Sequence, residues 1–125
     1  MKDIKISEMM EMQLKLWEEN RDKWSPMEPQ FGKTSLLWMI EEIGEVIAII
    51  KKKSEQEILE DENIRSKFLE EFADVYMYLT DTLLRYKVTP EEISNAYVEK
   101  YRKNIGRNYS EEYQAFLTME KENSV

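Results

Sequence analysis

Apolar residues recur every three or four positions along the chain, and the alternation typical of a β-strand is absent. This spacing predicts α-helices. Only three glycines and three prolines interrupt it, several of them in a predicted loop over residues 25–32. We expect long helices over residues 6–23, 35–53, 64–86 and 90–106, a short connecting helix after Ser54, and a weaker last helix over residues 110–121. The chain is therefore predicted to be all-α, a four-to-five-helix bundle.

Residues with known end preferences mark several of these helices. The run from Thr89 to Glu92 has Thr at the N-cap position, Pro next, and Glu three residues after the cap. Ser54 and Glu57 have the spacing of a capping box. Gly106 suits a left-handed C-cap, because glycine adopts that conformation without steric cost.

Length and charge limit the class of protein. The 125 residues suffice for one ordinary domain, and we expect a single domain over residues 1–125. Acidic residues outnumber basic ones 26 to 18, so the net charge is −8. That charge argues against a nucleic-acid polymer as partner, because contact with its backbone needs a basic surface. Three glutamates interrupt the longest apolar stretch, residues 36–50, so we expect no membrane span. With no apolar signal at the N-terminus, a cytoplasmic protein is predicted.

The sequence contains neither cysteine nor histidine. These absences exclude thiol catalysis, cysteine-ligated zinc, histidine-dependent triads and imidazole metal ligands. Any metal must then be held by oxygen, which favours Mg²⁺, Mn²⁺ or Ca²⁺. Acid–base chemistry would fall to carboxylates, lysine or tyrosine.

Four carboxylates stand where apolar core residues are expected. Glu42 and Glu45 occupy the middle of an otherwise inward-facing stripe that includes Trp38. Glu71 and Asp74 hold the same place on the next long helix. Antiparallel packing of the two helices would bring the pairs together, and a divalent cation would offset their repulsion. In so acidic a chain, the alternative is that such pairs arise by chance and lie on solvated faces.

These acids resemble the motif of the MazG-type, all-α nucleoside triphosphate pyrophosphohydrolases. The family pattern Glu-Glu-x-x-Glu, followed after a spacer by Glu-x-x-Asp, is matched by residues 41–45 and 71–74. The resemblance implies cleavage between the α and β phosphates with Mg²⁺ or Mn²⁺, in a homodimer or homotetramer. It implies four metal ligands, Glu42, Glu45, Glu71 and Asp74. It makes Glu41 an accessory ligand or the base for the attacking water; a surface charge is the alternative for Glu41.

A basic element farther along the chain also resembles the family, which tends to carry Lys…Asn-x-x-Arg there. Its residues are Lys100, Lys103, Asn104 and Arg107. Lys100, Asn104 and Arg107 share one face of the predicted helix and would hold the β and γ phosphates. Favourable charge at a helix C-terminus is the alternative, and we prefer it for Lys103.

Three aromatic residues are candidates for the walls of a nucleobase pocket: Trp24, Trp38 and Tyr78. Trp24 and Tyr78 match positions at which related enzymes contact the base. Core packing is the alternative for Trp38, since aromatic residues at helical spacing usually pack. Lys52 stands where some nucleotide-binding relatives carry an aromatic residue, so the resemblance leaves the preferred base open.

The sequence thus predicts a nucleoside triphosphate pyrophosphohydrolase that acts on a canonical or damaged (deoxy)nucleotide. Its expected role is house-cleaning of the nucleotide pool. One alternative is a non-enzymatic helical interaction module whose acidic stripes meet basic partner surfaces. Another is a phosphohydrolase of a non-nucleotide pyrophosphate, such as a phosphoribosyl compound. Apolar residues beyond the needs of one small core, among them Ile43, Ile47 and Leu79, predict an oligomer.

Overall fold

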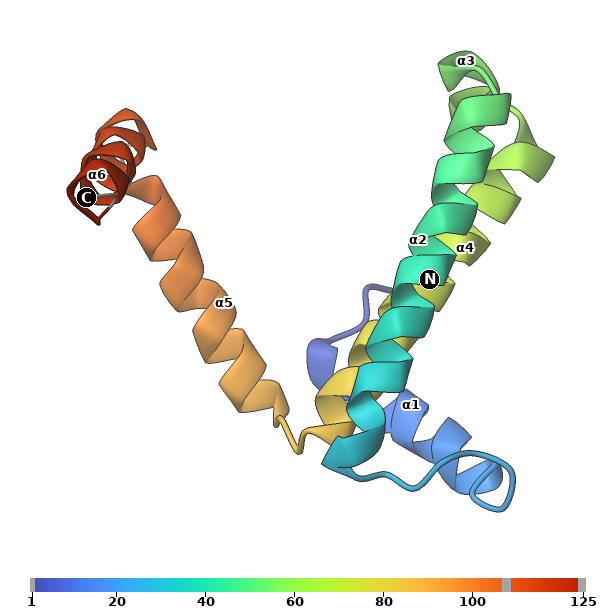
Figure 1. Ribbon diagram of the computed structural model, residues 1–125. Coiled ribbons are helices and arrows are strands. Elements are labelled where there is room, and N and C mark those ends of the chain that lie inside the picture. The colour runs from blue at the N-terminus through green and yellow to red at the C-terminus, as the bar shows by residue number, and fades with distance from the viewer. Residues whose placement is uncertain (1, 107–108, 124–125) are drawn as a thin grey trace. The chain divides into compact units, whose positions relative to one another are not determined.

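The computed structural model describes residues 2–106 and 109–123, and within them it contains helices and no strand (Figure 1). The all-α class is confirmed, and each predicted helical segment forms. The elements in chain order are α1 (Ile6–Glu19), the short 3-10 helix η1 (Pro29–Phe31), α2 (Gly32–Lys52), α3 (Glu55–Glu60), α4 (Glu62–Arg85), α5 (Pro90–Ile105) and α6 (Tyr109–Asn123).

The chain divides into two compact units, Met1–Pro90 and Glu91–Val125. That residues 1–125 act as one domain stays a prediction. In the first unit, α2 and α4 form a long antiparallel hairpin, and the colour gradient in Figure 1 runs along α2 and back along α4. α1 and α3 each pack against α4. The hairpin therefore brings the two acidic motifs to neighbouring helices. The second unit consists of α5, after its first residue, and α6.

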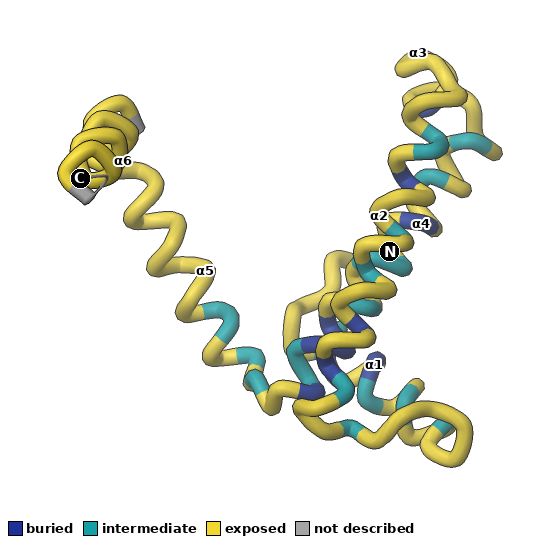
Figure 2. The backbone as a smooth tube through the Cα atoms, in the orientation of Figure 1, coloured by how far each residue is buried: buried dark blue, intermediate teal, exposed yellow. Residues whose placement is uncertain are grey.

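The core of the first unit is narrow. Its buried apolar residues are Met10, Val46 and Ile58, and Figure 2 shows the buried positions along the contacts of α1, α2 and α4. Buried polar residues outnumber them; these are Gln13, Ser35, Glu71, Thr80, Asp81, Thr82 and Arg85. Apolar side chains on α2 remain exposed, such as Leu37 and Ile40. The hairpin thus buries polar chemistry and leaves much apolar surface outside.

Several predicted helix ends agree with the structure. Ser54 caps α3 by accepting a hydrogen bond from the Glu57 N–H at 3.1 Å, and the Ser54 N–H donates to Glu57 Oε1 at 3.0 Å. This is the predicted capping box. α2 begins earlier than predicted, at Gly32, directly after η1. Gly32 lies against the Tyr86 ring, which a Cβ would overlap.

The expected left-handed cap at Gly106 is wrong. None of the described glycines has a positive φ, and the Gly106 N–H continues helical bonding to the Arg102 carbonyl at 3.3 Å. The left-handed residue follows α4 instead: Lys87 has φ 61°. Its N–H and that of Val88 return to carbonyls in the last turn of α4. This turn ends α4 as a Schellman motif without glycine. In the described part of the chain, no helix has both the length and the apolarity needed to cross a membrane.

Candidate active site

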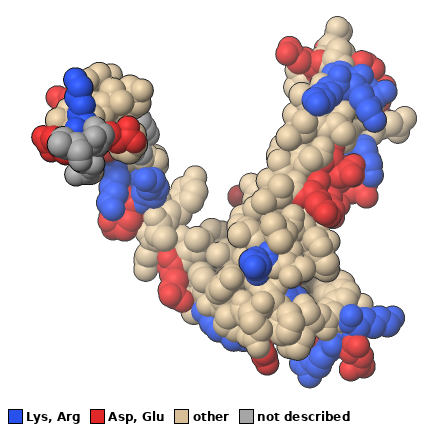
Figure 3. Space-filling view, viewed as in Figure 1, with Lys and Arg blue, Asp and Glu red and all other residues tan. Residues whose placement is uncertain are grey.

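Three acids from the two hairpin helices meet at the middle of the α2–α4 contact. Each of Glu42, Glu71 and Asp74 offers one carboxylate oxygen, and these oxygens lie within 4.8 Å of one another. Glu71 is 6% exposed, whereas Glu42 and Asp74 are half-buried. Figure 3 shows acidic side chains gathered along the hairpin, with basic side chains toward its α3 end. The two motifs are thus combined into one carboxylate cluster.

The charges within this cluster interact. Burial raises the pKa of Glu42, and a side-chain hydrogen bond with Glu71 and the negative charge of Asp74 raise that pKa further. The pKa of Glu71 is lowered, chiefly because Lys67 donates a hydrogen bond to it. Lys67 Nζ lies 2.9 Å from Glu71 Oε1. The cluster therefore concentrates negative charge, and Lys67 compensates that charge only through its pair with Glu71.

These residues fit a hard divalent cation. Carboxylate oxygens are the ligands that Mg²⁺ and Mn²⁺ prefer. Oxygens about 2.1 Å from an ion stand up to about 4.2 Å apart, close to the upper separation of 4.8 Å in the cluster. The pKa of Glu42 is raised first by burial and then by its acidic neighbours, and a bound cation would favour the ionised form against both effects.

The structure places Glu45 and Glu41 beside the cluster rather than within it. Glu45 is exposed one turn farther along α2, and its charge contributes to the raised pKa of Glu42. Glu41 is exposed as well, and its charge contributes to the raised pKa of Tyr78, whose main cause is burial. Both acids thus act electrostatically on residues of the site. Their roles as ligand and base stay predictions.

A cavity of about 430 Å³ adjoins the cluster, because Asp74 lines it. Its wall contains all the predicted base-binding residues: Trp24, Trp38 and Tyr78. The rings of Trp38 and Tyr78 meet edge to face with centroids 5.9 Å apart. Trp38 is 49% exposed, so the alternative that it packs in the core is wrong. The helical spacing of Trp38 could not reveal this, since exposure depends on what packs against α2.

Sequence reasoning missed a buried polar network in the same cavity wall. Arg85 Nε donates to Asp81 Oδ2 at 2.7 Å, and the Ser35 hydroxyl donates to the same oxygen. Arg85 Nη1 donates to Ser25 Oγ at 2.8 Å and to the Pro26 carbonyl at 2.7 Å. Arg85 therefore ties the loop after Trp24 to α4. Asp81 and Arg85 have the spacing of an ordinary surface ion pair. They also continue the helical stripe of Glu71 and Asp74, and this periodicity is the signal that could have indicated their burial.

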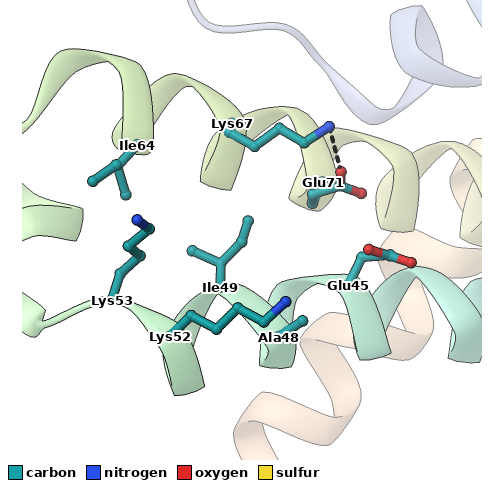
Figure 4. A pocket seen from close by; sticks show the side chains of 8 residues that line it. All are labelled: Glu45, Ala48, Ile49, Lys52, Lys53, Ile64, Lys67 and Glu71. Carbon is teal, nitrogen blue, oxygen red and sulfur yellow. Dashed lines mark ion pairs between the residues drawn. The ribbon is translucent and has the colours of Figure 1, made fainter.

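A second, smaller cavity lies on the other side of the cluster along the hairpin. It measures about 210 Å³, and Figure 4 shows Glu45 and Glu71 at one end of it with Lys52, Lys53 and Lys67 around it. The sequence signals only favourable basic charge at the end of α2. The hairpin sets these lysines around the same cavity as the two acids, and Lys67 is paired with Glu71.

The predicted phosphate-binding residues belong to the second unit. Lys100, Lys103 and Asn104 are exposed on α5, and their spacing places them on one side of that helix. Arg107 lies outside the described residues. Phosphate binding by these four residues stays a prediction.

Fold and site together define a class of protein. Carboxylates from two neighbouring helices meet beside an aromatic-walled cavity in an all-α chain, as expected of a MazG-like nucleoside triphosphate pyrophosphohydrolase. In a comparison with family models, residues 17–121 match the family described as dATP/dGTP pyrophosphohydrolase, and the chain belongs to that family. It is therefore a nucleotide pyrophosphohydrolase, an enzyme that hydrolyses a phosphoric anhydride. No curated protein and no solved structure matched the chain.

Proposed function

We propose that this protein is a Mg²⁺-dependent pyrophosphohydrolase of purine deoxynucleoside triphosphates, with dATP and dGTP as the first candidates. Mn²⁺ is the expected substitute for Mg²⁺. One observation carries the proposal: Asp74 belongs both to the carboxylate cluster and to the wall of the aromatic cavity. A nucleotide whose base occupies that cavity would bring its phosphates to the cluster. The family description supports the two named substrates.

The proposed reaction is attack of water on phosphorus with cleavage of the α–β anhydride bond, which yields the nucleoside monophosphate and pyrophosphate. Glu42, Glu71 and Asp74 would hold Mg²⁺, with Glu45 as the further ligand. When bound, Mg²⁺ neutralises phosphate charge and acidifies water. Glu41 would accept the proton of the attacking water. Alignment and charge stabilisation then supply most of the rate enhancement.

The order of side chains along the hairpin gives the substrate a direction. The aromatic cavity lies on one side of the cluster, and the cavity lined by Lys52, Lys53 and Lys67 lies on the other. With the base at the aromatic end, the β and γ phosphates would lie toward the lysines, whose positive charge attracts them. Lys100, Lys103, Asn104 and Arg107 stay in the proposal as further phosphate ligands.

We also propose that the active form is a homodimer or homotetramer. Apolar side chains on α2 are exposed beyond what a monomer normally leaves in water; they include Leu37, Ile40, Ile47 and Ile50, at 54%, 58%, 46% and 53% exposure. A second copy would cover such a surface. House-cleaning of the nucleotide pool in the cytoplasm is the proposed role.

The proposal is tested on purified protein with a panel of dNTPs and NTPs, with Mg²⁺ or Mn²⁺, and with chromatographic identification of products. We expect equimolar monophosphate and pyrophosphate. Glu71→Gln should abolish turnover and the Mg²⁺-dependent rise in Tm. Glu70→Gln, the same change at an exposed neighbour on α4, is the matched control and should retain both. Absence of turnover on the whole panel would overturn the proposal, and conversion of a phosphoribosyl pyrophosphate alone would favour the non-nucleotide alternative.

A further inference from the structure

One residue that lines the aromatic cavity has a buried acceptor with no partner among the described residues. Asp81 on α4 is 5% exposed and lines the cavity of about 430 Å³. Its Oδ2 accepts hydrogen bonds from Ser35 and Arg85. Its Oδ1 is buried and accepts none from the residues that the structure describes. A buried polar atom without a hydrogen-bond partner lowers the stability of the folded protein. A ligand that donates a hydrogen bond to this atom would remove that penalty, so the atom marks a candidate binding position.

The surrounding bonds hold this carboxylate in one orientation. Arg85 is itself fixed by its bonds to Ser25 Oγ and the Pro26 carbonyl. The Ser35 hydroxyl comes from α2, on the opposite side of the hairpin contact. Because both donors use Oδ2, the carboxylate cannot rotate Oδ1 toward either of them without losing bonds already made. Oδ1 is thus an unused acceptor held in one place beside the cavity.

We propose that Asp81 is a specificity-determining residue that accepts an N–H from the edge of the nucleobase. This inference rests on the proposed function, which places the base in this cavity between Trp24, Trp38 and Tyr78. Adenine presents a 6-amino group and guanine a 2-amino group, so both candidate bases carry a suitable donor. A base that turns a carbonyl oxygen toward Oδ1 brings two acceptors together and is disfavoured.

The competing explanation is that Asp81 and Arg85 form a purely structural ion pair. The two explanations differ in what they predict for the base. A structural pair affects all substrates alike through stability, whereas an acceptor for the base separates substrates that differ by one amino group. Substrate pairs of that kind are dATP against 2′-deoxypurine riboside triphosphate, and dGTP against dITP.

The first measurement uses the unmodified protein with Mg²⁺ and compares kcat/KM within both pairs. We expect the amino-bearing member of a pair to be preferred by about 10- to 100-fold, the range for a hydrogen bond to a charged group. Equal kcat/KM within both pairs would overturn the inference while leaving the proposed function intact. Absence of any nucleotide turnover would instead overturn the proposed function.

The second measurement uses Asp81→Asn. The amide oxygen can still accept from Ser35 and Arg85, and the amide NH₂ then replaces the free acceptor with a donor. We expect the preference for the amino-bearing base to disappear. Ser35→Ala is the matched control, because it removes a bond to Oδ2 and leaves Oδ1 unchanged; it should lower Tm and keep the preference. An unchanged preference in Asp81→Asn would overturn the inference. Should Asp81→Asn fail to fold, the comparison in the unmodified protein decides.

Discussion

Lys67 Nζ lies 2.9 Å from Glu71 Oε1, so the most buried acid of the carboxylate cluster is paired one helical turn along α4. The two side chains differ in environment, since that of Lys67 is 59% exposed and that of Glu71 is 8% exposed. The lysine thus reaches in from solvent to a charge that the hairpin contact has removed from water. Lys67 and a divalent cation would compete for the same carboxylate.

Lys67→Met tests this competition. Loss of the ammonium leaves the acids less compensated, so we expect a lower Tm without metal. It also removes a like charge beside the cation, so Mg²⁺ should bind on the order of 3- to 10-fold more tightly. Mg²⁺ titrations followed by Tm in the absence of nucleotide measure both effects. Lys51→Met, at an exposed lysine on α2, is the control. Weaker Mg²⁺ binding in Lys67→Met would contradict the competition.

Asp74→Asn separates catalysis from folding. The amide is a poorer ligand than the carboxylate, so turnover should fall by at least about 100-fold if Asp74 holds the metal. The metal-free protein should keep or raise its Tm, because the change relieves repulsion among three acids within 4.8 Å. Steady-state kinetics and thermal denaturation measure the two effects. Asp3→Asn, an exposed residue before α1, should change neither. A large loss of Tm together with activity would show a structural role instead.

Two glycines on α2 should respond to alanine with opposite sign. Apart from chain neighbours and the adjacent backbone of α2, no atom of the described residues lies within 4 Å of the position of a Cβ on Gly44, so Gly44→Ala should stabilise the chain by about 0.5–1 kcal/mol through helix propensity. A Cβ on Gly32 overlaps the Tyr86 ring, so Gly32→Ala should destabilise it by about 1–3 kcal/mol. Urea denaturation of both variants is the measurement. A loss of stability in Gly44→Ala that depends on protein concentration would indicate that Gly44 lies against a partner subunit.

The cap of α3 should give a pH-dependent contribution to stability. Hydrogen bonds, above all that from the Ser54 N–H, lower the pKa of Glu57 below its ordinary value of 4.5. The folded state therefore favours the ionised carboxylate. This contribution is present above pH 4.5 and is lost as the pH falls through the lowered pKa of the folded state.

We expect Glu57→Gln to lower Tm at neutral pH, with a difference from the unmodified protein that shrinks below pH 4.5. Thermal denaturation between neutral and acidic pH measures it. Glu55→Gln, in the same turn but away from the cap bonds, is the control. Ser54→Ala should cost about 1 kcal/mol at neutral pH. A difference between Glu57→Gln and the unmodified protein that grows with acidification would contradict the assignment.

The helices were predictable from the chain alone, because apolar periodicity and capping act over a few residues. The pairing of Ser54 with Glu57 and the start of α5 at Pro90 both follow from such local preferences. The acidic motifs could also be recognised, since charged residues within apolar runs are visible in any helical projection. Two helix boundaries could not be predicted in this way: α1 ends at Glu19, earlier than predicted, and α2 begins early, at Gly32. At the start of α2, Gly32 lies against Tyr86, a residue distant along the chain, and local preferences cannot indicate that contact.

Tertiary packing decided which polar residues share the site. Glu42 and Glu45 look equivalent along the sequence, yet only Glu42 joins Glu71 and Asp74. Asp81 shares the helical stripe of Glu71 and Asp74, but only the structure shows that one of its oxygens is buried without a partner among the described residues. Both outcomes depend on the rotation of α2 and α4 about their own axes and on the loop that Arg85 holds against them. Those contacts join residues far apart in the chain, and short-range periodicity does not predict which residues make them.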